Sequence, residues 1–341
     1  MKLTYRTRRR LHRLGVAIGY LLLAALIIGI CWVIWLERFV VYTDDGVRLD
    51  FDYTSPAGTT QIAQPPEEAT VAIYYNEGED QINTSSELTQ LRGYYATTSM
   101  LASSVDNVAS TIDSLPAGSA IMLELKNGYG SFFYSSKLTG APTTDQLDVT
   151  KVDELIQKLA AKDIYLIARV PAFRDRAYGL EHTTYGLAVS SGGYLWAGDD
   201  NCYWLNPTSN GALSWLISIT TELKDLGFDE VVFTDFCFPD TDNITFDSSM
   251  TRQEALEAAA ETLVSTCATS KFAVSFESAN PAFNLPEGRT RLYLTNVDAS
   301  DAAQVSESTT VADKTINLVF LTNTNDTRFE AFGVMRPMPG M

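Results

Sequence analysis

The stretch Gly227-Phe-Asp-Glu-Val-Val-Phe-Thr-Asp-Phe-Cys-Phe-Pro239 carries the strongest structural signal in this chain of 341 residues. The residues before it, 214–226, repeat apolar side chains at helical spacing, and Gly227 suits the left-handed position that follows a helix. Val231–Phe236 is β-branched and aromatic, which is typical of a buried parallel strand. Asp235 lies at the C-terminal end of this predicted strand. In α/β barrels catalytic side chains emerge at that end, so we predict a functional role for Asp235.

Strands and helices alternate on both sides of this stretch. We predict strands at 93–97, 120–126, 164–170, 231–236, 272–277, 292–296 and 316–322, and helices at 103–115, 149–162, 213–226 and 252–270. Repeated βα units indicate a parallel sheet covered by helices, and about 250 residues is the usual size of a (β/α)8 barrel. We therefore predict an α/β fold, a TIM-like (β/α)8 barrel over residues 91–341. Only residues 330–334 remain for an eighth strand, which favours a distorted or incomplete barrel, with a doubly wound open sheet as the alternative.

A membrane anchor is predicted ahead of the barrel. Residues 15–36 carry no charge, and 22 residues at about 1.5 Å each would cross a hydrocarbon core of about 30 Å. Residues 1–14 contain six basic residues and no acid, which predicts a cytoplasmic tail. We therefore expect a single-pass protein of the cell membrane with an extracellular C-terminal domain. Residues 37–90 are predicted to contain a hairpin around Asp45-Gly46, a linker and a short strand at 71–75.

The chain beyond residue 36 is strongly acidic. It contains 19 basic and 42 acidic residues, a formal charge of −23. Such a charge argues against nucleic acid or anionic lipid as a partner. Histidine occurs only at His12 and His182, which excludes a histidine-based zinc site, and a Ser-His-Asp triad would have to use His182. Since no phosphate-binding glycine loop or nucleotide fingerprint occurs either, we predict no cofactor and no metal.

Two further groups of residues are interpreted as structural. Cys31 lies in the predicted membrane span, which leaves an odd number of cysteines, Cys202, Cys237 and Cys267. A Cys202–Cys237 bridge would require both loops at one rim, and three small buried thiols are the favoured interpretation. The acidic residues at 240–247 lack the spacing and glycine of a calcium loop, which favours a solvated loop.

Five blocks resemble, in the same order, a known family. They are Leu91-Arg-Gly-Tyr-Tyr95, Ile121-Met-Leu-Glu-Leu-Lys126, Ile164-Tyr-Leu-Ile-Ala-Arg-Val-Pro-Ala-Phe-Arg-Asp175, Trp204-Leu-Asn-Pro207 and Gly227–Pro239. The family is the "putative glycoside hydrolase domain" of bacterial surface proteins. The resemblance implies a TIM-like barrel and an O-glycosyl hydrolase that acts on a polysaccharide or cell-envelope glycan.

The chain departs from the family pattern at one place. The family's block reads Phe-Asp-Tyr-Ile-Arg-Phe-Pro, whereas this chain has Phe233-Thr-Asp-Phe-Cys-Phe-Pro239. The acid is displaced by one residue, and Cys237 stands where the family has arginine. Because side chains alternate along a strand, a shift of one residue would turn the acid to the opposite face. Either a bulge at the strand end returns Asp235 to the pocket, or the catalytic acid is lost.

Three acids at predicted strand ends are the catalytic candidates. Glycoside hydrolysis generally uses two carboxyl groups that flank the scissile bond. Glu124, Asp235 and Glu277 each lie near the C-terminal end of a predicted buried strand. The structural alternatives are a buried ion pair for Glu124 with Lys126, which shares its strand face, and a helix cap for Asp235.

Five residues are predicted to bind the substrate or orient the acids. Arg169 lies inside an apolar strand, and a buried arginine needs a carboxylate partner, which Glu124 or Asp235 could supply. Lys126 would bind a sugar hydroxyl or hold Glu124 ionised. Trp196 and Trp204 would stack on a sugar ring, with burial of the long loop as their alternative role. Asn206 is predicted to bind the substrate because its block, Trp204-Leu-Asn-Pro207, resembles the family.

Three functions compete at this point. The leading hypothesis is a membrane-anchored extracytoplasmic glycosidase. The alternative is a catalytically degenerate barrel that serves as a glycan-binding or scaffold module at the cell envelope. A third, an envelope assembly partner that works through protein contacts, depends only on the predicted anchor and linker.

Overall fold

The computed structural model of the protein describes residues 40–43, 46–49, 88–162, 164–246 and 249–340. The chain divides into two compact units, Met1–Tyr74 and Tyr75–Met341. In the first unit, β1 (Val40–Thr43) pairs antiparallel with β2 (Gly46–Leu49), which confirms the predicted hairpin. The predicted membrane span, linker and strand at 71–75 lie outside the described residues. None of the helices in the described ranges is long and apolar enough to cross a membrane.

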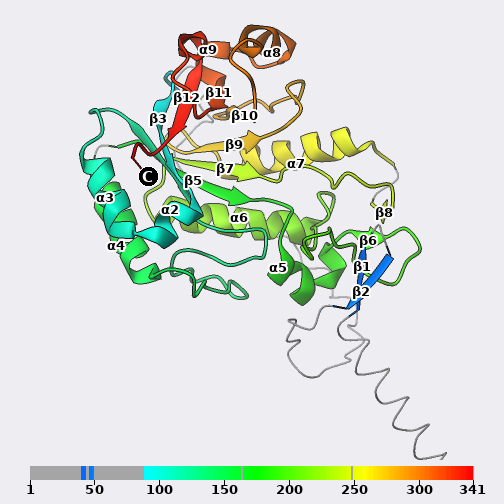
Figure 1. Ribbon diagram of the computed structural model, residues 1–341. Helices are drawn as coiled ribbons and strands as arrows, with labels where there is room; N and C mark the ends of the chain where they lie inside the picture. The colour runs from blue at the N-terminus through cyan, green and yellow to red at the C-terminus, as the bar shows by residue number, and fades with distance from the viewer. Residues whose placement is uncertain (1–39, 44–45, 50–87, 163, 247–248, 341) are drawn as a thin grey trace, which may run out of the picture. The chain divides into compact units, whose positions relative to one another are not determined.

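In the described part of the second unit, eight parallel strands close into a barrel (Figure 1). Each strand pairs with the next one in the series, and the last pairs with the first. The TIM-like barrel is thus confirmed and is closed, so the predicted incompleteness is wrong. The strands are β3 (Arg92–Ala96), β4 (Ala120–Glu124), β5 (Leu166–Pro171), β7 (Glu230–Thr234), β9 (Ala273–Glu277), β10 (Leu292–Thr295), β11 (Leu318–Leu321) and β12 (Gly333–Pro337).

Helices occupy most of the connections between strands and lie outside the barrel (Figure 1). The connection from β9 to β10, residues 278–291, has no helix. The connection from β5 to β7 is the longest, and its β6 (Ala188–Val189) pairs antiparallel with β8 (Ile244–Thr245). The helices are α2 (Thr98–Ser103), α3 (Val105–Asp113), α4 (Val149–Ala160), α5 (Arg176–Glu181), η3 (Thr183–Tyr185), α6 (Asn210–Asp225), α7 (Arg252–Cys267), α8 (Ala302–Ser308), α9 (Lys314–Asn317) and η4 (Thr327–Ala331).

Most predicted elements differ from the observed ones at their ends, and two of these differences have a clear local cause. The predicted helix at 103–115 begins at Val105, because the Ser104 hydroxyl accepts a hydrogen bond from Asn107 N at 3.1 Å and caps the helix there. The eighth strand begins at Gly333 rather than at residue 330, because residues 327–331 form a 3-10 turn. Local capping and turn formation therefore moved both boundaries.

Side chains alternate between two apolar layers along the strands. On β7, Val231 and Phe233 belong to the layer between the barrel and its helices, whereas Val232 belongs to a smaller cluster inside the barrel. The interior cluster also contains Met122 of β4 and Ile167 of β5. This alternation of a parallel strand determines which side chains point into the barrel at its mouth, where the strands end.

The connection into β7 follows the sequence prediction closely. Helix α6 ends at Asp225, and Gly227 has φ +92°. A Cβ at this position would also lie 2.7 Å from Ala160 Cβ of α4. Glycine therefore allows both the left-handed turn and the close approach of α4.

A buried polar network lies at the opposite end of the barrel, where the strands begin. Glu230 accepts hydrogen bonds from the Tyr293 hydroxyl and the Tyr165 hydroxyl, both at 2.8 Å, and forms an ion pair with Arg291. The Arg291 guanidinium also donates to the carbonyl oxygens of Thr89, at 3.0 Å, and Ile316, at 3.1 Å. The side chains of Glu230 and Arg291 are 0% and 1% exposed. Each buried charge is therefore paired and hydrogen-bonded, as burial requires.

Candidate active site at the mouth of the barrel

Three charged side chains share the interior face of the barrel at its mouth. Glu124 follows Met122 by two residues, and Arg169 follows Ile167 by two residues, so both continue the interior rows of their strands. Glu277 ends β9, where Val274 and Phe276 belong to the outer layer. Alternation alone therefore brings two acids and one arginine to the same end of the barrel.

Arg169 ties the two acids together. Its Nε donates to Glu277 Oε2 at 2.9 Å and its Nη2 donates to Glu277 Oε1 at 3.0 Å, a two-point contact. Its Nη1 donates to Glu124 Oε1. The predicted pairing of Arg169 with Glu124 is confirmed, and the additional contact with Glu277 was not predicted. The guanidinium therefore holds both carboxylates in fixed orientations.

Glu124 has a second set of donors on its other oxygen. The backbone N–H of Thr98 donates to Glu124 Oε2 at 2.8 Å, and the Thr98 hydroxyl donates to the same oxygen at 3.2 Å. Thr98 begins α2, so a helix N-terminus faces this carboxylate. The donors on both oxygens fix the direction of the Glu124 carboxyl group.

Asp235 reaches the mouth because the backbone changes direction after β7. The strand ends at Thr234, and Asp235 has φ +48°, in the left-handed region. Phe236 then enters the outer layer, where it packs against Phe173 and Phe276. Thr234 and Asp235 consequently both line the same cavity at the mouth. The acid is displaced by one residue relative to the family, and the left-handed conformation of Asp235 compensates for this displacement. It brings Asp235 to the mouth cavity, as a bulge was predicted to do.

Asp235 and Glu277 differ in their electrostatic surroundings. Burial raises the pKa of Asp235, and the positive charges of Arg174, Arg169 and Lys126 partly oppose this effect. Its ion-pair contact, with Arg174 Nη1, is long at 3.8 Å. Burial also raises the pKa of Glu277, although its hydrogen-bonded partner Arg169 opposes the rise. Asp235 is therefore the acid that combines a raised pKa with weak pairing, the combination required of a proton donor.

Two adjoining cavities open at the mouth. One, of about 320 Å³, is lined by Asp235, Glu124 and Glu277 together with Arg169 and Arg174. The other, of about 550 Å³, shares Glu124 and Arg169 as its wall. The rest of its lining is mainly polar and comes from the ends of β3, β10 and β11: Tyr95, Thr97, Thr295, Asn296, Val297, Asp298, Ala299, Leu321, Thr322, Asn323 and Thr324. An extended polar ligand would pass the carboxyl groups on its way from one cavity to the other.

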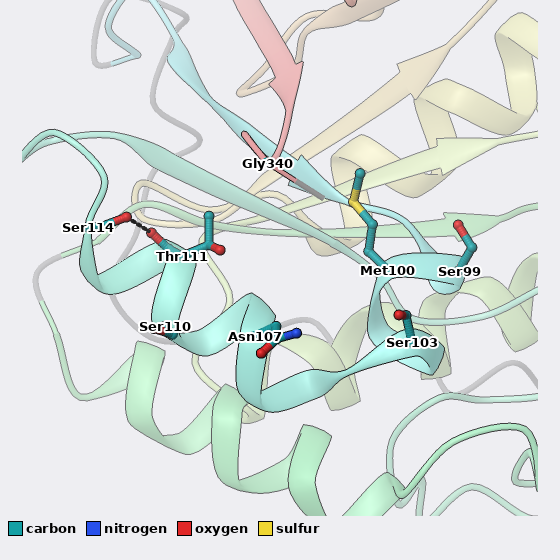
Figure 2. Close-up of a pocket in the computed structure, with 8 residues that line it drawn as sticks. All are labelled: Ser99, Met100, Ser103, Asn107, Ser110, Thr111, Ser114 and Gly340. Atoms are coloured by element: carbon teal, nitrogen blue, oxygen red, sulfur yellow. Dashed lines mark hydrogen bonds between the residues drawn. The ribbon is translucent and has the colours of Figure 1, made fainter.

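A third and larger cavity, of about 660 Å³, lies beside α2 and α3 and shares no lining residue with the two mouth cavities (Figure 2). Figure 2 shows hydroxyl and amide side chains of these two helices, with Met100 and Gly340 completing the lining. None of the residues that line it is ionisable. This cavity therefore lacks the groups that acid–base chemistry needs, in spite of its size.

Lys126 does not pair with Glu124. Its Nζ lies 2.8 Å from Asp175 Oδ2, and both side chains are almost completely buried. Asp175 in turn caps α5 by accepting from Tyr178 N at 3.0 Å. The prediction that Lys126 holds Glu124 is therefore wrong, because the chain turns after β4 and gives the lysine a buried partner. Lys126 still contributes to the lining of the smaller mouth cavity.

The structure does not bring Trp196, Trp204 and Asn206 to the two mouth cavities. Trp196 is 5% exposed and is part of the core, and Trp204 packs against the core next to Arg174, with which it forms a β-bridge. Asn206 Oδ1 accepts from the Thr208 backbone N–H at 3.0 Å. All three thus stabilise the long β5–β7 connection, the alternative role noted for the tryptophans.

Sequence reasoning missed Arg174. It lies in the loop after β5, where its guanidinium contacts Asp200 and approaches Asp235. The sequence signal that could have identified Arg174 is its position within residues 164–175, the third block that resembles the family. With Cys237 at the position of the family's arginine, Arg174 is the residue that presents a guanidinium to Asp235.

The cysteines of the described chain are free thiols. Cys202 and Cys267 are buried as predicted, whereas Cys237 is exposed. The left-handed turn at Asp235 sends Phe236 into the core and leaves Cys237 outside, so the predicted burial of Cys237 is wrong. In the residues that the structure describes, no group of three or more His, Cys, Asp or Glu side chains could hold a metal ion.

The chain was compared with known protein families, curated proteins and solved structures. A family model described as "Putative glycosyl hydrolase domain" matches residues 93–276. A comparison with curated proteins finds no match. Among solved structures, a hypothetical protein from Ruminiclostridium thermocellum is 19% identical, with a TM-score of 0.46, and the match covers 54% of this chain and 96% of that one.

Two glycosidases of larger size are also similar. An inactive mutant of the GH20 exo-β-N-acetylglucosaminidase from Vibrio harveyi is 10% identical over 73% of this chain and 50% of that one, with a TM-score of 0.50. An α-galactosidase from Lactobacillus brevis is 9% identical over 75% of this chain and 38% of that one, with a TM-score of 0.48. This chain therefore spans half or less of either enzyme. At 10% identity, the similarity to the Vibrio harveyi enzyme supports the barrel fold alone.

Proposed function

Because the chain belongs to the family of the "Putative glycosyl hydrolase domain", we propose that it hydrolyses a glycosidic bond of an envelope or extracellular glycan at the mouth of its barrel. The observation that carries the proposal is the pair of carboxyl groups, Asp235 and Glu124, in one cavity but in unlike surroundings. In glycosidases, unlike surroundings give the two carboxyl groups different pKa values, so that one acts as the acid and the other as the nucleophile or base.

In this proposal Asp235 is the general acid. Its pKa, raised by burial, keeps a larger share of the carboxyl protonated near neutral pH than an exposed aspartate would have. The proton passes to the bridging oxygen as the bond to the anomeric carbon breaks. Glu124 then either attacks that carbon or deprotonates the attacking water. The anomeric configuration of the first product, measured by NMR, distinguishes these two routes.

Arg169 is a positioning residue in this scheme. It fixes Glu124 and Glu277 through one guanidinium. Arg169 divides its hydrogen bonds between the two acids, so Glu124 is not its only partner. The polar side chains of the larger cavity, such as Asn296, Asp298 and Asn323, would bind sugar hydroxyls on one side of the bond.

The proposal is tested by release of reducing ends from a panel of envelope and extracellular polysaccharides. Wild-type protein is expected to release new reducing ends from at least one of them. Binding of a glycan without any product would instead favour the degenerate binding module, the alternative suggested by the displaced acid. A stable protein partner without carbohydrate affinity would favour the scaffold hypothesis.

The pH profile provides a separate prediction. Arg174 lowers the pKa of Asp235, and burial raises it. Replacing Arg174 by methionine should therefore raise the pKa of Asp235 and move the alkaline limb of the kcat/KM profile to higher pH, because the general acid stays protonated longer. The same substitution at the exposed Arg328 serves as the control and should leave the limb in place. A limb that stays in place or moves to lower pH in Arg174→Met would contradict the assignment of Asp235 as the acid.

We also propose that residues 15–36 anchor the protein in the cell membrane, with the barrel on the extracellular side. The support for this is the uncharged stretch and the basic residues before it. The test is the reaction of Cys237, the exposed cysteine of the described chain, with a membrane-impermeant maleimide in intact cells. Labelling of wild type but not of Cys237→Ser is expected, and labelling only after lysis would contradict the orientation.

A further inference from the structure

A fourth cavity lies at the base of the barrel, at the end opposite the mouth. It has a volume of about 200 Å³ and is lined by residues that precede or begin β3, β4, β5 and β10. Three arginines, Arg92, Arg289 and Arg291, contribute to its lining, and no acidic residue does. In a chain with a formal charge of −17, this concentration of positive charge is unusual and is independent of the mouth.

Two of these arginines have partners within the fold. Arg291 is paired with Glu230 and donates to the Thr89 and Ile316 carbonyl oxygens. Arg92 is paired with Glu330, which also accepts from Arg336. Glu230 and Glu330 are therefore already engaged by other arginines.

Arg289 has no such partner. It is 8% exposed, and no residue that the structure describes forms an ion pair or a hydrogen bond with its side chain. Its Nε is completely buried without an acceptor. A buried, unpaired guanidinium is costly, and proteins avoid it unless a counter-charge is present. Arg289 nevertheless lines the cavity, which offers space for such a counter-charge.

We propose that the base cavity binds a small oxyanion, a phosphate or a carboxylate group, with Arg289 as its principal ligand. The planar fork of a guanidinium matches the oxygens of both groups. The volume of about 200 Å³ limits the ligand to a single such group, either a free ion or the end of a larger molecule. This site is separate from the proposed hydrolytic site and does not depend on it.

The test is the thermal midpoint of the full 341-residue chain in a non-ionic detergent, in sodium phosphate, sodium acetate or sodium chloride of equal ionic strength. A ligand that binds the folded state raises the midpoint, and we expect phosphate or acetate to raise that of wild type by roughly 5 °C over chloride. Of these two anions, the one with the larger effect identifies the group as phosphate or carboxylate.

Arg289→Met provides the decisive comparison. In chloride its midpoint should equal or exceed that of wild type, because an unpaired buried charge is removed. Its response to phosphate and acetate should be lost, whereas Arg328→Met, which removes an exposed arginine, should respond like wild type. A wild-type chain that behaves identically in all three salts, or an Arg289→Met variant that keeps the full response, would overturn the proposal.

Discussion

Replacing Asp235 by asparagine is expected to lower kcat for glycan hydrolysis by about 10²–10⁴-fold. Asparagine has nearly the same shape but cannot give a proton to the leaving oxygen. The fold should not suffer. Burial raises the pKa of Asp235, so the ionised form is disfavoured in the folded state. A neutral amide should therefore leave the free energy of unfolding at neutral pH unchanged or slightly increased.

The measurement is the rate of reducing-end release, together with a thermal unfolding curve for each variant. Asp240→Asn is the matched control, because Asp240 is an exposed acid just beyond the same turn. Its activity should equal that of wild type. Full activity in Asp235→Asn would remove Asp235 from the mechanism. Equal losses in both variants would point to disruption of the turn rather than loss of a proton donor.

Replacing Arg291 by methionine is expected to lower the free energy of unfolding by about 3–5 kcal/mol, the usual effect of breaking a buried ion pair. Glu230 would keep the hydroxyls of Tyr165 and Tyr293 as donors, but its charge would be buried without a cation. The double variant Arg291→Met, Glu230→Gln should recover part of this loss, because no charge is then left in the core.

Urea unfolding of the full chain measures these differences. Arg328→Met breaks the exposed pair with Asp326, and such a pair contributes at most about 1 kcal/mol. A loss in Arg291→Met no larger than in this control would show that the network at the barrel base contributes little. A double variant less stable than Arg291→Met would contradict the explanation by an unpaired charge.

Much of the fold could be predicted from periodicity. The helix that ends before Gly227, the buried strand after it and the repeated βα units were all readable, because side chains of helices and parallel strands follow fixed spacings. The strand boundaries and the closure of the barrel were harder to predict from the sequence. Closure depends on the pairing of β12 with β3, residues that lie more than 230 positions apart in the sequence.

The site was predicted where it depends on strand alternation. Glu124, Arg169 and Glu277 point into the mouth because of their place in the interior rows, which the sequence alone indicates. The direction of Asp235 depends on one backbone angle, φ +48°, and only its displacement relative to the family was visible. The left-handed conformation of Asp235 accompanies the packing of the next residue, Phe236, against Phe173 and Phe276. Such tertiary contacts cannot be read from the local sequence.

Long-range partners could not be assigned. Lys126 pairs with Asp175 and Arg174 approaches Asp235, although the sequence offered many acids to each cation. Which pair forms is decided by loops whose courses have no periodic signal. Trp196 and Trp204 show the same limit, since a tryptophan in a long loop covers the core as readily as it binds a sugar.

The central claim is that Asp235 and Glu124 act on one glycosidic bond, and it is tested most directly by a crystal structure of Asp235→Asn with a bound oligosaccharide substrate. We predict that the bridging oxygen lies about 2.6–3.2 Å from the side chain at position 235, with the anomeric carbon facing Glu124. An oligosaccharide held elsewhere on the protein, or one whose glycosidic bonds all lie beyond reach of both side chains, would contradict the claim.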